Sequence, residues 1–344
     1  MKALKEKYLR PGRKITDQFV LATGLSVLIM VAAEIILPIG GLLLGSFERI
    51  LGGNHDAAAF LRDYFDFISI WIGLFLVVII FKANRPMLRA VKYCRPDAGG
   101  SGDGSAAAGP GSGTNGNPAR NNITGLLIGF ALGFGTNGFC VLMSALLGDI
   151  HLAYSGFRPV PFLLFFVCVF IQSAAEELAD RWYLYQKLRR RYRQPWIAIA
   201  VNSLVFMVLH LMNPGVTFPA VLQLVLIAVL FSLFVHYYNG LWIAMAYHAA
   251  WNFTQSIFFG LPNSGIVSAY SVFRLDAASA RNGIFYNVNF GVEGSIGAVA
   301  IIMILTVIVI VKNRGKGEHT DIWAEADQAA VERAAKKASI ENAG

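Results

Sequence analysis

Charged residues are scarce in this chain. Asp, Glu, Lys and Arg together make up only 15% of its 344 residues, while 56% of the residues are hydrophobic. Soluble globular domains carry about 25% charged residues, because charge covers their water-facing surface. The scarcity of charge therefore excludes an ordinary soluble domain and predicts an integral membrane protein.

Cysteine is also scarce, and the common metal and nucleophile motifs are missing. Cys94, Cys140 and Cys168 form neither a CxxC pair nor a disulfide framework, and we interpret them as apolar fillers plus one loop thiol. The HExxH motif of zinc proteases is absent. No GxSG serine motif lies in an apolar stretch, and the GxGD at residues 100–103 is a chance match in a low-complexity segment.

Long apolar stretches are what the sequence has in abundance. A hydrocarbon core about 30 Å thick needs roughly 20 apolar residues of helix, and lipid leaves backbone groups no partner outside the helix. We therefore predict an all-α polytopic membrane protein with about eight transmembrane helices. The predicted spans are residues 17–44, 64–83, 122–147, 160–187, 196–212, 217–236, 240–260 and 291–312.

The lysines and arginines lie mostly on one side of this arrangement. Most of the 29 fall at the N-terminus, between the second and third spans, after the fourth span and after the last one. The positive-inside rule then places both termini in the cytoplasm. The net charge of +8 thus reflects membrane topology. We expect no nucleic-acid partner, only membrane lipid and a membrane-bound or peptide substrate.

Composition divides the chain into membrane and non-membrane segments. Residues 97–121 are rich in Gly and Ser with almost nothing apolar, so we expect a disordered cytoplasmic linker. The C-terminal residues alternate Glu and Lys with alanines, as a solvated helix does. The predicted organisation is a basic cytoplasmic N-terminus (1–16), the first two transmembrane helices (17–96), the linker (97–121), a six-helix membrane core (122–312) and a cytoplasmic tail (313–344).

Glycines recur at helical spacing in the third predicted span. Gly125, Gly129 and Gly133 form a small-xxx-small pattern, which lets two membrane helices approach closely. We interpret this face as structural.

Ionisable residues inside a bilayer are costly, so each one is a functional hypothesis. The densest set lies in the fourth span and includes Glu176, Glu177 and Arg181. Glu177 and Arg181 are four residues apart and can form an ion pair on one helix face. Glu176 points about 100° away, toward another neighbour. Two carboxylates in different environments can supply one site with a paired structural acid and a free base.

Two further polar pairs follow at helical spacing. His210 lies four residues after Phe206 near the end of the fifth span, and Asn252 lies four residues after His248 in the seventh. At about 1.5 Å per residue, Glu176 and these polar side chains lie roughly 12 to 21 Å from the cytoplasmic ends of their helices. We therefore expect them to meet near the middle of the bilayer.

The ordered motifs EExxxR, FxxxH and HxxxN resemble the three signatures of the CPBP family, the CAAX-protease and bacteriocin-processing proteins. That family includes CAAX prenyl endopeptidases and many bacterial Abi-type proteins. The resemblance covers roughly residues 120–260 and implies that the six-helix core is catalytic. Asp180 stands where an aromatic residue is common and Trp182 where glycine is usual. We expect both to affect the pocket without touching a motif position.

The resemblance implies an intramembrane endopeptidase that acts on membrane-associated or lipidated proteins or peptides. A glutamate and a histidine would activate a water molecule, and two polar side chains would stabilise the oxyanion. The implied catalytic residues are Glu176 and His210 for the water and His248 and Asn252 for the oxyanion, with Glu177 and Arg181 orienting the site.

The resemblance leaves the use of a metal open. The family is often labelled metalloprotease, and one glutamate with two histidines is a plausible zinc-ligand set. If zinc is bound, the candidate ligands are Glu176, His210 and His248. The alternative is a metal-free site in which glutamate and histidine act directly on water, so no cofactor is certain.

Two other functions compete with proteolysis. The first is a non-catalytic membrane scaffold or bacteriocin-immunity protein of the same fold. The second is a transporter, which is disfavoured because the sequence shows no inverted repeat. The compact spans and short cytoplasmic segments are typical of a bacterial plasma-membrane protein.

Overall fold

The computed structural model describes residues 7–95 and 118–341. The ends of the predicted N-terminal and C-terminal segments and most of the predicted linker lie outside the described residues. The last four linker residues are described, and they are anchored rather than disordered. Asn121 is buried and donates its side-chain amide to the carbonyl of Ala90 at 2.8 Å. The linker prediction is therefore wrong for this short stretch.

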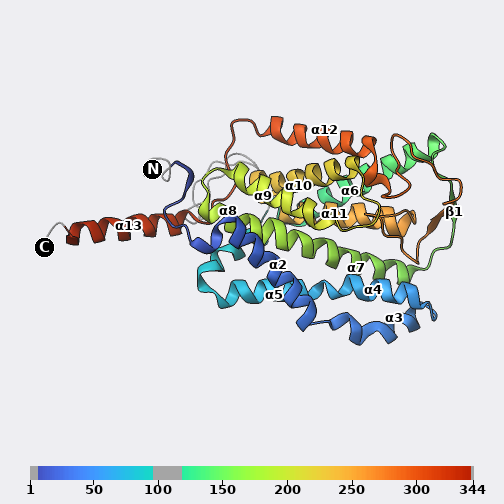
Figure 1. Cartoon of the computed structure of the whole chain (residues 1–344), viewed down its shortest axis with the longest axis horizontal. Coiled ribbons are helices and arrows are strands. Elements are labelled where there is room, and N and C mark those ends of the chain that lie inside the picture. Colours follow the sequence, from blue (N-terminus) through green and yellow to red (C-terminus); the bar gives the residue numbers. More distant parts are fainter. Residues whose placement is uncertain (1–6, 96–117, 342–344) are drawn as a thin grey trace.

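The described chain is built mostly from helices, which confirms an α-helical membrane protein. Five helical segments are long and apolar enough to cross a membrane, namely Phe19–Ile50, His55–Ile80, Ile123–Leu146, Pro159–Arg191 and Phe218–Tyr238. Two shorter apolar helices are Pro195–His210 and Ile296–Lys312. A small antiparallel sheet pairs β1 (Leu152–Tyr154) with β2 (Phe273–Leu275) at the end of the molecule far from both termini (Figure 1).

The helices follow the chain in an order that can be traced in Figure 1. Short 3₁₀ turns join several of them. The helices are α2 (Phe19–Ile36), α3 (Leu44–Ile50), α4 (His55–Asp66), α5 (Ile68–Ile80), α6 (Ile123–Leu146), α7 (Pro159–Glu177), α8 (Tyr185–Arg191), α9 (Pro195–His210), α10 (Phe218–Tyr238), α11 (Leu241–Phe253), α12 (Ile296–Lys312) and α13 (Ala324–Glu341).

Helix boundaries coincide with capping and proline signals. Side-chain oxygens of Asn54, Asn122, Thr217 and Ser295 accept a hydrogen bond from the backbone N–H three residues later. Such caps satisfy donors that a helix N-terminus leaves without intrahelical partners. α7, α9 and α10 also carry proline in their first turn, where no N–H is needed.

Several predicted spans differ from the observed helices at their ends. The second, predicted as 64–83, belongs to a helical segment that begins at His55 and ends at Ile80. The first predicted span is interrupted because Pro38 disfavours helical backbone at Leu37, and α2 ends at Ile36. The last predicted span starts too early. Gly291 adopts a left-handed φ of 82°, and α12 begins only after Ser295. The residues before Ser295 therefore belong to a loop and the 3₁₀ helix η6 (Val292–Gly294).

One long central helix organises the molecule. α7 runs through the π-helical segment η4 (Leu178–Leu184) into α8. It lies between the group formed by α2, α3, α4 and α5 and the group formed by α6, α9, α10, α11 and α12 (Figure 1). Side chains on several faces of this helix are buried, including the full length of η4. The central helix is thus placed to carry a site lined from both groups.

Close packing of α6 on α11 fixes the helix that carries two of the predicted site residues. A Cβ at Gly129 would lie 2.4 Å from the carbonyl oxygen of Ile243, and one at Gly133 would lie 2.4 Å from that of Tyr247. The predicted glycine face is confirmed at these two positions. Gly125 instead faces the backbone of Arg120, next to its own helix start.

Buried ion pairs join the helices at one end of the molecule. This is the end where both termini lie (Figure 1). Asp17 is fully buried and forms ion pairs with Lys187, at 2.7 Å, and with Arg190. Burial alone disfavours the charged carboxylate of Asp17. The hydrogen bonds and positive charges of Arg190 and Lys187 outweigh this cost and hold the pKa of Asp17 below its usual value. These ion pairs join the segment before α2 to the end of the central helix.

Candidate active site

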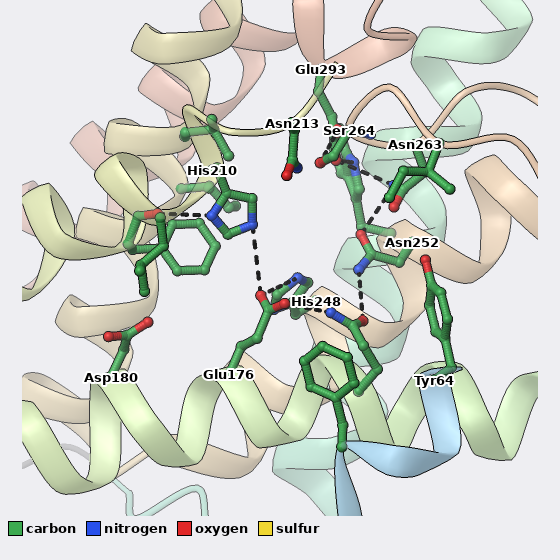
Figure 2. Close-up of a pocket in the computed structure, with 18 of the residues that line it drawn as sticks. Tyr64, Glu176, Asp180, His210, Asn213, His248, Asn252, Asn263, Ser264 and Glu293 are labelled. Carbon is green, nitrogen blue, oxygen red and sulfur yellow. Dashed lines mark hydrogen bonds and ion pairs between the residues drawn. The ribbon is translucent and has the colours of Figure 1, made fainter. Parts of the chain in front are cut away.

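A cavity of about 450 Å³ opens beside the middle of the central helix. Its size is within the range of ordinary ligand pockets. Residues from α2, α4, α7, α9, α10, α11 and η6 line it, so both helix groups contribute. Figure 2 shows Glu176, His210, His248 and Asn252 around its centre. The four residues that were predicted to meet line one cavity.

Glu176 faces two histidines across the cavity. Its Oε2 lies 3.8 Å from Nε2 of His210 and 3.8 Å from Nε2 of His248. Its other oxygen, Oε1, accepts a hydrogen bond from Gln172. Oε2 is buried and has no hydrogen-bond partner among the described residues. Three polar atoms thus surround one point from three different helices.

Both histidines present an unprotonated nitrogen to Glu176 when they are neutral. Nδ1 of His210 lies 2.8 Å from the carbonyl oxygen of Phe206, and Nδ1 of His248 lies 3.0 Å from Oε1 of Glu177. A carbonyl and a carboxylate only accept, so each Nδ1 must carry the proton. The two Nε2 atoms and Oε2 of Glu176 are therefore acceptors suited to a water molecule.

A buried ion pair supports this arrangement from behind. Nη1 of Arg181 lies 3.2 Å from Oε1 of Glu177, and both side chains are fully buried. The guanidinium of Arg181 also lies 4.4 Å from the ring centre of Phe206, a cation–π contact. Phe206 in turn packs against the ring of His210. Phe206 thus lies between the Glu177–Arg181 ion pair and the ring of His210.

Asn252 is held by its neighbours rather than directed freely into the cavity. Its Nδ2 donates to Oγ of Ser173 at 3.2 Å and makes a longer 3.5 Å contact with Oε1 of Gln172. Its Oδ1 accepts from Nδ2 of Asn263 at 3.2 Å. Asn252 therefore connects the central helix to the loop after α11.

Several polar residues of the cavity were not predicted from the sequence. Figure 2 shows Tyr64, Asn263, Ser264 and Glu293 around the upper and right sides of the cavity. Glu293 accepts hydrogen bonds from Trp251 and Asn263 and from both the backbone and the hydroxyl of Ser264. These residues come from loops and from the N-terminal helices, where no motif marks them.

The two departures from the family pattern have structural roles. Asp180 lines the cavity, and its carboxylate lies 3.6 Å from Nη1 of Arg181. The expectation that Asp180 touches no motif position is therefore wrong, because its carboxylate lies beside the guanidinium of Arg181. Trp182 points the other way, and its Nε1 donates to the carbonyl of Met87 at 2.7 Å.

The spacing of the donor atoms is wide for a zinc site. Zinc bonds of about 2.0–2.1 Å in tetrahedral geometry put neighbouring ligand atoms about 3.3 Å apart, against the 3.8 Å between Glu176 and each histidine. Within residues 7–95 and 118–341, no group of three or more His, Cys, Asp or Glu is arranged to hold a metal ion. The described side chains are therefore not preformed for zinc.

Fold and site together define an α-helical membrane protein with a glutamate–histidine centre that lines a cavity. Residues 158–254 match the family model described as "Rce1-like: Type II CAAX prenyl endopeptidase Rce1-like". The matched stretch contains all three motifs, so the resemblance to the CAAX-protease family is confirmed. No curated protein and no solved structure matches the chain.

Proposed function

We propose that this protein is an intramembrane endopeptidase in which Glu176 activates a water molecule for attack on a peptide bond. The observation that carries the proposal is the convergence of the side chains of Glu176, His210 and His248 on one point of the cavity. Oε2 of Glu176 is the acceptor that lacks a hydrogen-bond partner. A water placed there would donate to Glu176 and to Nε2 of His210.

The proposed reaction starts with proton transfer from this water to Glu176. The water oxygen bonds to the carbonyl carbon of the substrate, and the carbonyl electron pair moves onto its oxygen. When the intermediate collapses, the carbon–nitrogen bond breaks, and protonated Glu176 returns its proton to the leaving amine. Such positioned proton transfer contributes about 10²–10⁴-fold to rate. His210 holds the water in line.

His248 is the proposed main donor to the oxyanion. As an imidazolium it would donate from Nε2, while Nδ1 stays hydrogen-bonded to Glu177. The negative charge of Glu177 stabilises that imidazolium, and Arg181 balances Glu177. Asn252 would add a second donor by releasing its 3.5 Å contact with Gln172, the longest in its network. Donors fixed in a water-poor site stabilise developing charge effectively.

The family description, which names a CAAX prenyl endopeptidase, supports a proposal for the substrate class. We propose membrane-associated or lipidated proteins or peptides, which can reach a cavity enclosed by membrane helices. The proposed location is a bacterial plasma membrane, with about eight spans and both termini in the cytoplasm. The basic residues Lys187, Arg189 and Arg190 lie at the end of the molecule where both termini are, which supports this orientation under the positive-inside rule.

Cleavage by the full chain in lipid nanodiscs tests the proposal. The probes are peptides with a farnesylated cysteine followed by three varied residues, and mass spectrometry identifies new termini. We expect wild-type protein to cleave a subset and Glu176→Gln to lose at least about 10³-fold in rate. Asp56→Asn, which changes an exposed carboxylate outside the cavity, should cleave like wild type. Equal cleavage by Glu176→Gln contradicts the proposal.

A further inference from the structure

Glu34 is an unpaired carboxylate in an otherwise apolar membrane helix. It lies on α2, and although it is exposed it lines the same cavity as Glu176. It forms no hydrogen bond or ion pair with any residue of the described chain. An ionisable group in a membrane helix is costly and normally has a partner or a function. The missing partner of Glu34 therefore points to a group that enters the cavity.

The lining of the cavity is acidic overall. Among the described residues that line it there is no lysine or arginine. Two of its carboxylates already have cationic neighbours, since Asp63 contacts Arg62 and Asp180 contacts Arg181. Glu34 has none. The lining carboxylates are Glu34, Asp63, Glu176, Asp180 and Glu293, from five different elements.

An independent buried group also calls for a hydrogen-bond donor. Gln223 on α10 lines the cavity and is only 2% exposed. Its Oε1 has no hydrogen-bond partner in the part of the chain that the structure describes. A buried acceptor left without a donor is destabilising. Apart from Oε2 of Glu176, it is the one buried unsatisfied atom among the described lining residues, and both atoms are acceptors.

The acidic lining, the unpaired Glu34 and the unsatisfied acceptor of Gln223 would all be matched by a cation that carries several hydrogen-bond donors. Lysine and arginine side chains supply positive charge and only donors. An acidic residue would be repelled by the lining carboxylates, and a neutral residue would leave Glu34 unpaired. The peptide substrate is thus expected to present a basic residue to the cavity.

We infer that Glu34 is a specificity residue that binds a lysine or arginine side chain of the substrate, while Gln223 accepts a hydrogen bond from another N–H of the same peptide. The inference rests on the proposed function in that the ligand is the peptide to be cleaved. The residues matching the family model begin at 158, whereas Glu34 belongs to the N-terminal helices. The proposed catalytic residues therefore lie in the segment that matches the family model, whereas the proposed specificity residue lies in the N-terminal helices.

Binding can test this inference separately from cleavage. The probes are fluorescein-labelled peptides with a farnesylated cysteine, identical except for Lys, Gln or Glu at one position, which is scanned along the peptide. Fluorescence anisotropy measures their affinity for the full chain in nanodiscs, in a Glu176→Gln background that prevents turnover. We expect one position where Lys binds about tenfold more tightly than Gln, and Glu more weakly than Gln.

Variants at Glu34 then decide the assignment. Glu34→Gln should bring the Lys and Gln peptides within about twofold of each other, and Glu34→Lys should favour the Glu peptide. Asp56→Asn is the matched control and should keep the Lys preference. Equal affinity of the three peptides at every position, or a Lys preference that survives Glu34→Gln, overturns the inference.

Cleavage of the same peptides by the otherwise wild-type chain separates the two proposals. A Glu34-dependent Lys preference in binding without any cleavage supports the inference and contradicts the proposed proteolysis. Cleavage with no Lys preference in either assay supports proteolysis and overturns the role of Glu34.

Discussion

Glu176 and Glu177 are adjacent in sequence but lie in different environments. The side chain of Glu177 is completely buried between Arg181 and His248, whereas that of Glu176 remains 15% exposed and borders the cavity. Neighbouring residues on a helix diverge by about 100°, so one can reach a structural ion pair while the other meets the substrate. Helix geometry alone therefore separates a positioning carboxylate from a reacting one.

The role of Glu177 predicts coupled effects with His248. Glu177→Gln should lower kcat by about 10–100-fold with little change in KM, because the amide stabilises the imidazolium less than a carboxylate does. His248→Ala should lower kcat further. In the double variant the losses should be clearly less than multiplicative, because both residues act through one hydrogen bond. Independent, multiplicative losses in steady-state kinetics contradict this coupling.

The wide spacing of Glu176, His210 and His248 leads to a prediction about metal. Purified protein should keep its peptidase activity after dialysis against a chelator, with zinc well below one ion per chain by elemental analysis. A site at equilibrium with one tightly bound zinc would behave differently. Stoichiometric zinc whose removal abolishes cleavage, and whose return restores it, contradicts a water held by the side chains alone.

The central polar residues could be predicted because each pair has helical spacing. His248 and Asn252 share a helix face whatever the surrounding fold, and simple depth counting brought them near Glu176. Glu293 could not be found this way, because it lies in the short 3₁₀ helix η6, which the apolar pattern assigned to the last span. Glu34 carried a usable signal, since it is the one charged residue within α2.

At the scale of elements, the contact between α6 and α11 controls the position of the site. α11 is buried at every position except Trp242 and carries His248 and Asn252. Gly133 faces its backbone at a distance that leaves no room for a methyl group. A side chain there must push α11 away from the central helix, and with it the proposed oxyanion donor.

Gly133→Ala should therefore destabilise the protein by about 1–3 kcal/mol through overpacking and reduce cleavage. Gly135→Ala is a matched control on the same helix, because a Cβ at Gly135 meets nothing within 4 Å. Thermal unfolding in detergent and cleavage rates measure both effects. If the two variants behave alike, close packing at Gly133 does not position the site.

Helix positions could largely be predicted, but their irregularities could not. Apolar length located the spans, and the capping residues agree with the observed starts. The π-helical segments η4 and η5 (Thr254–Phe258) follow directly after site residues on α7 and α11. Such segments are frequent at functional sites. The apolar pattern predicts continuous helix through both segments, so it could not reveal these irregularities.

At the scale of the whole molecule, buried charges at one end hold the N-terminal segment to the central helix. Asp17 contacts both Lys187 and Arg190. Removing one member of a buried charge cluster costs about 3–5 kcal/mol, because its partners stay buried without compensation. Asp17→Asn should lower the unfolding temperature accordingly, as measured in detergent at neutral pH.

The same cluster predicts a pH dependence. The pKa of Asp17 is lower in the folded protein than its usual value of 3.8. Its contribution is therefore fully present above that value and is lost as the pH falls through the lower, folded pKa. The difference in unfolding temperature between wild type and Asp17→Asn should shrink only under such acidic conditions. A difference that vanishes near pH 6 contradicts the depressed pKa.

The central claim is that Glu176 makes this membrane protein a protease. The most direct test compares protein termini and released peptides in the native host carrying wild type or Glu176→Gln at matched expression. The account predicts new termini on membrane-associated proteins with wild type only. Identical peptide populations, together with a host phenotype that still requires the protein, contradict it and favour a scaffold or immunity role.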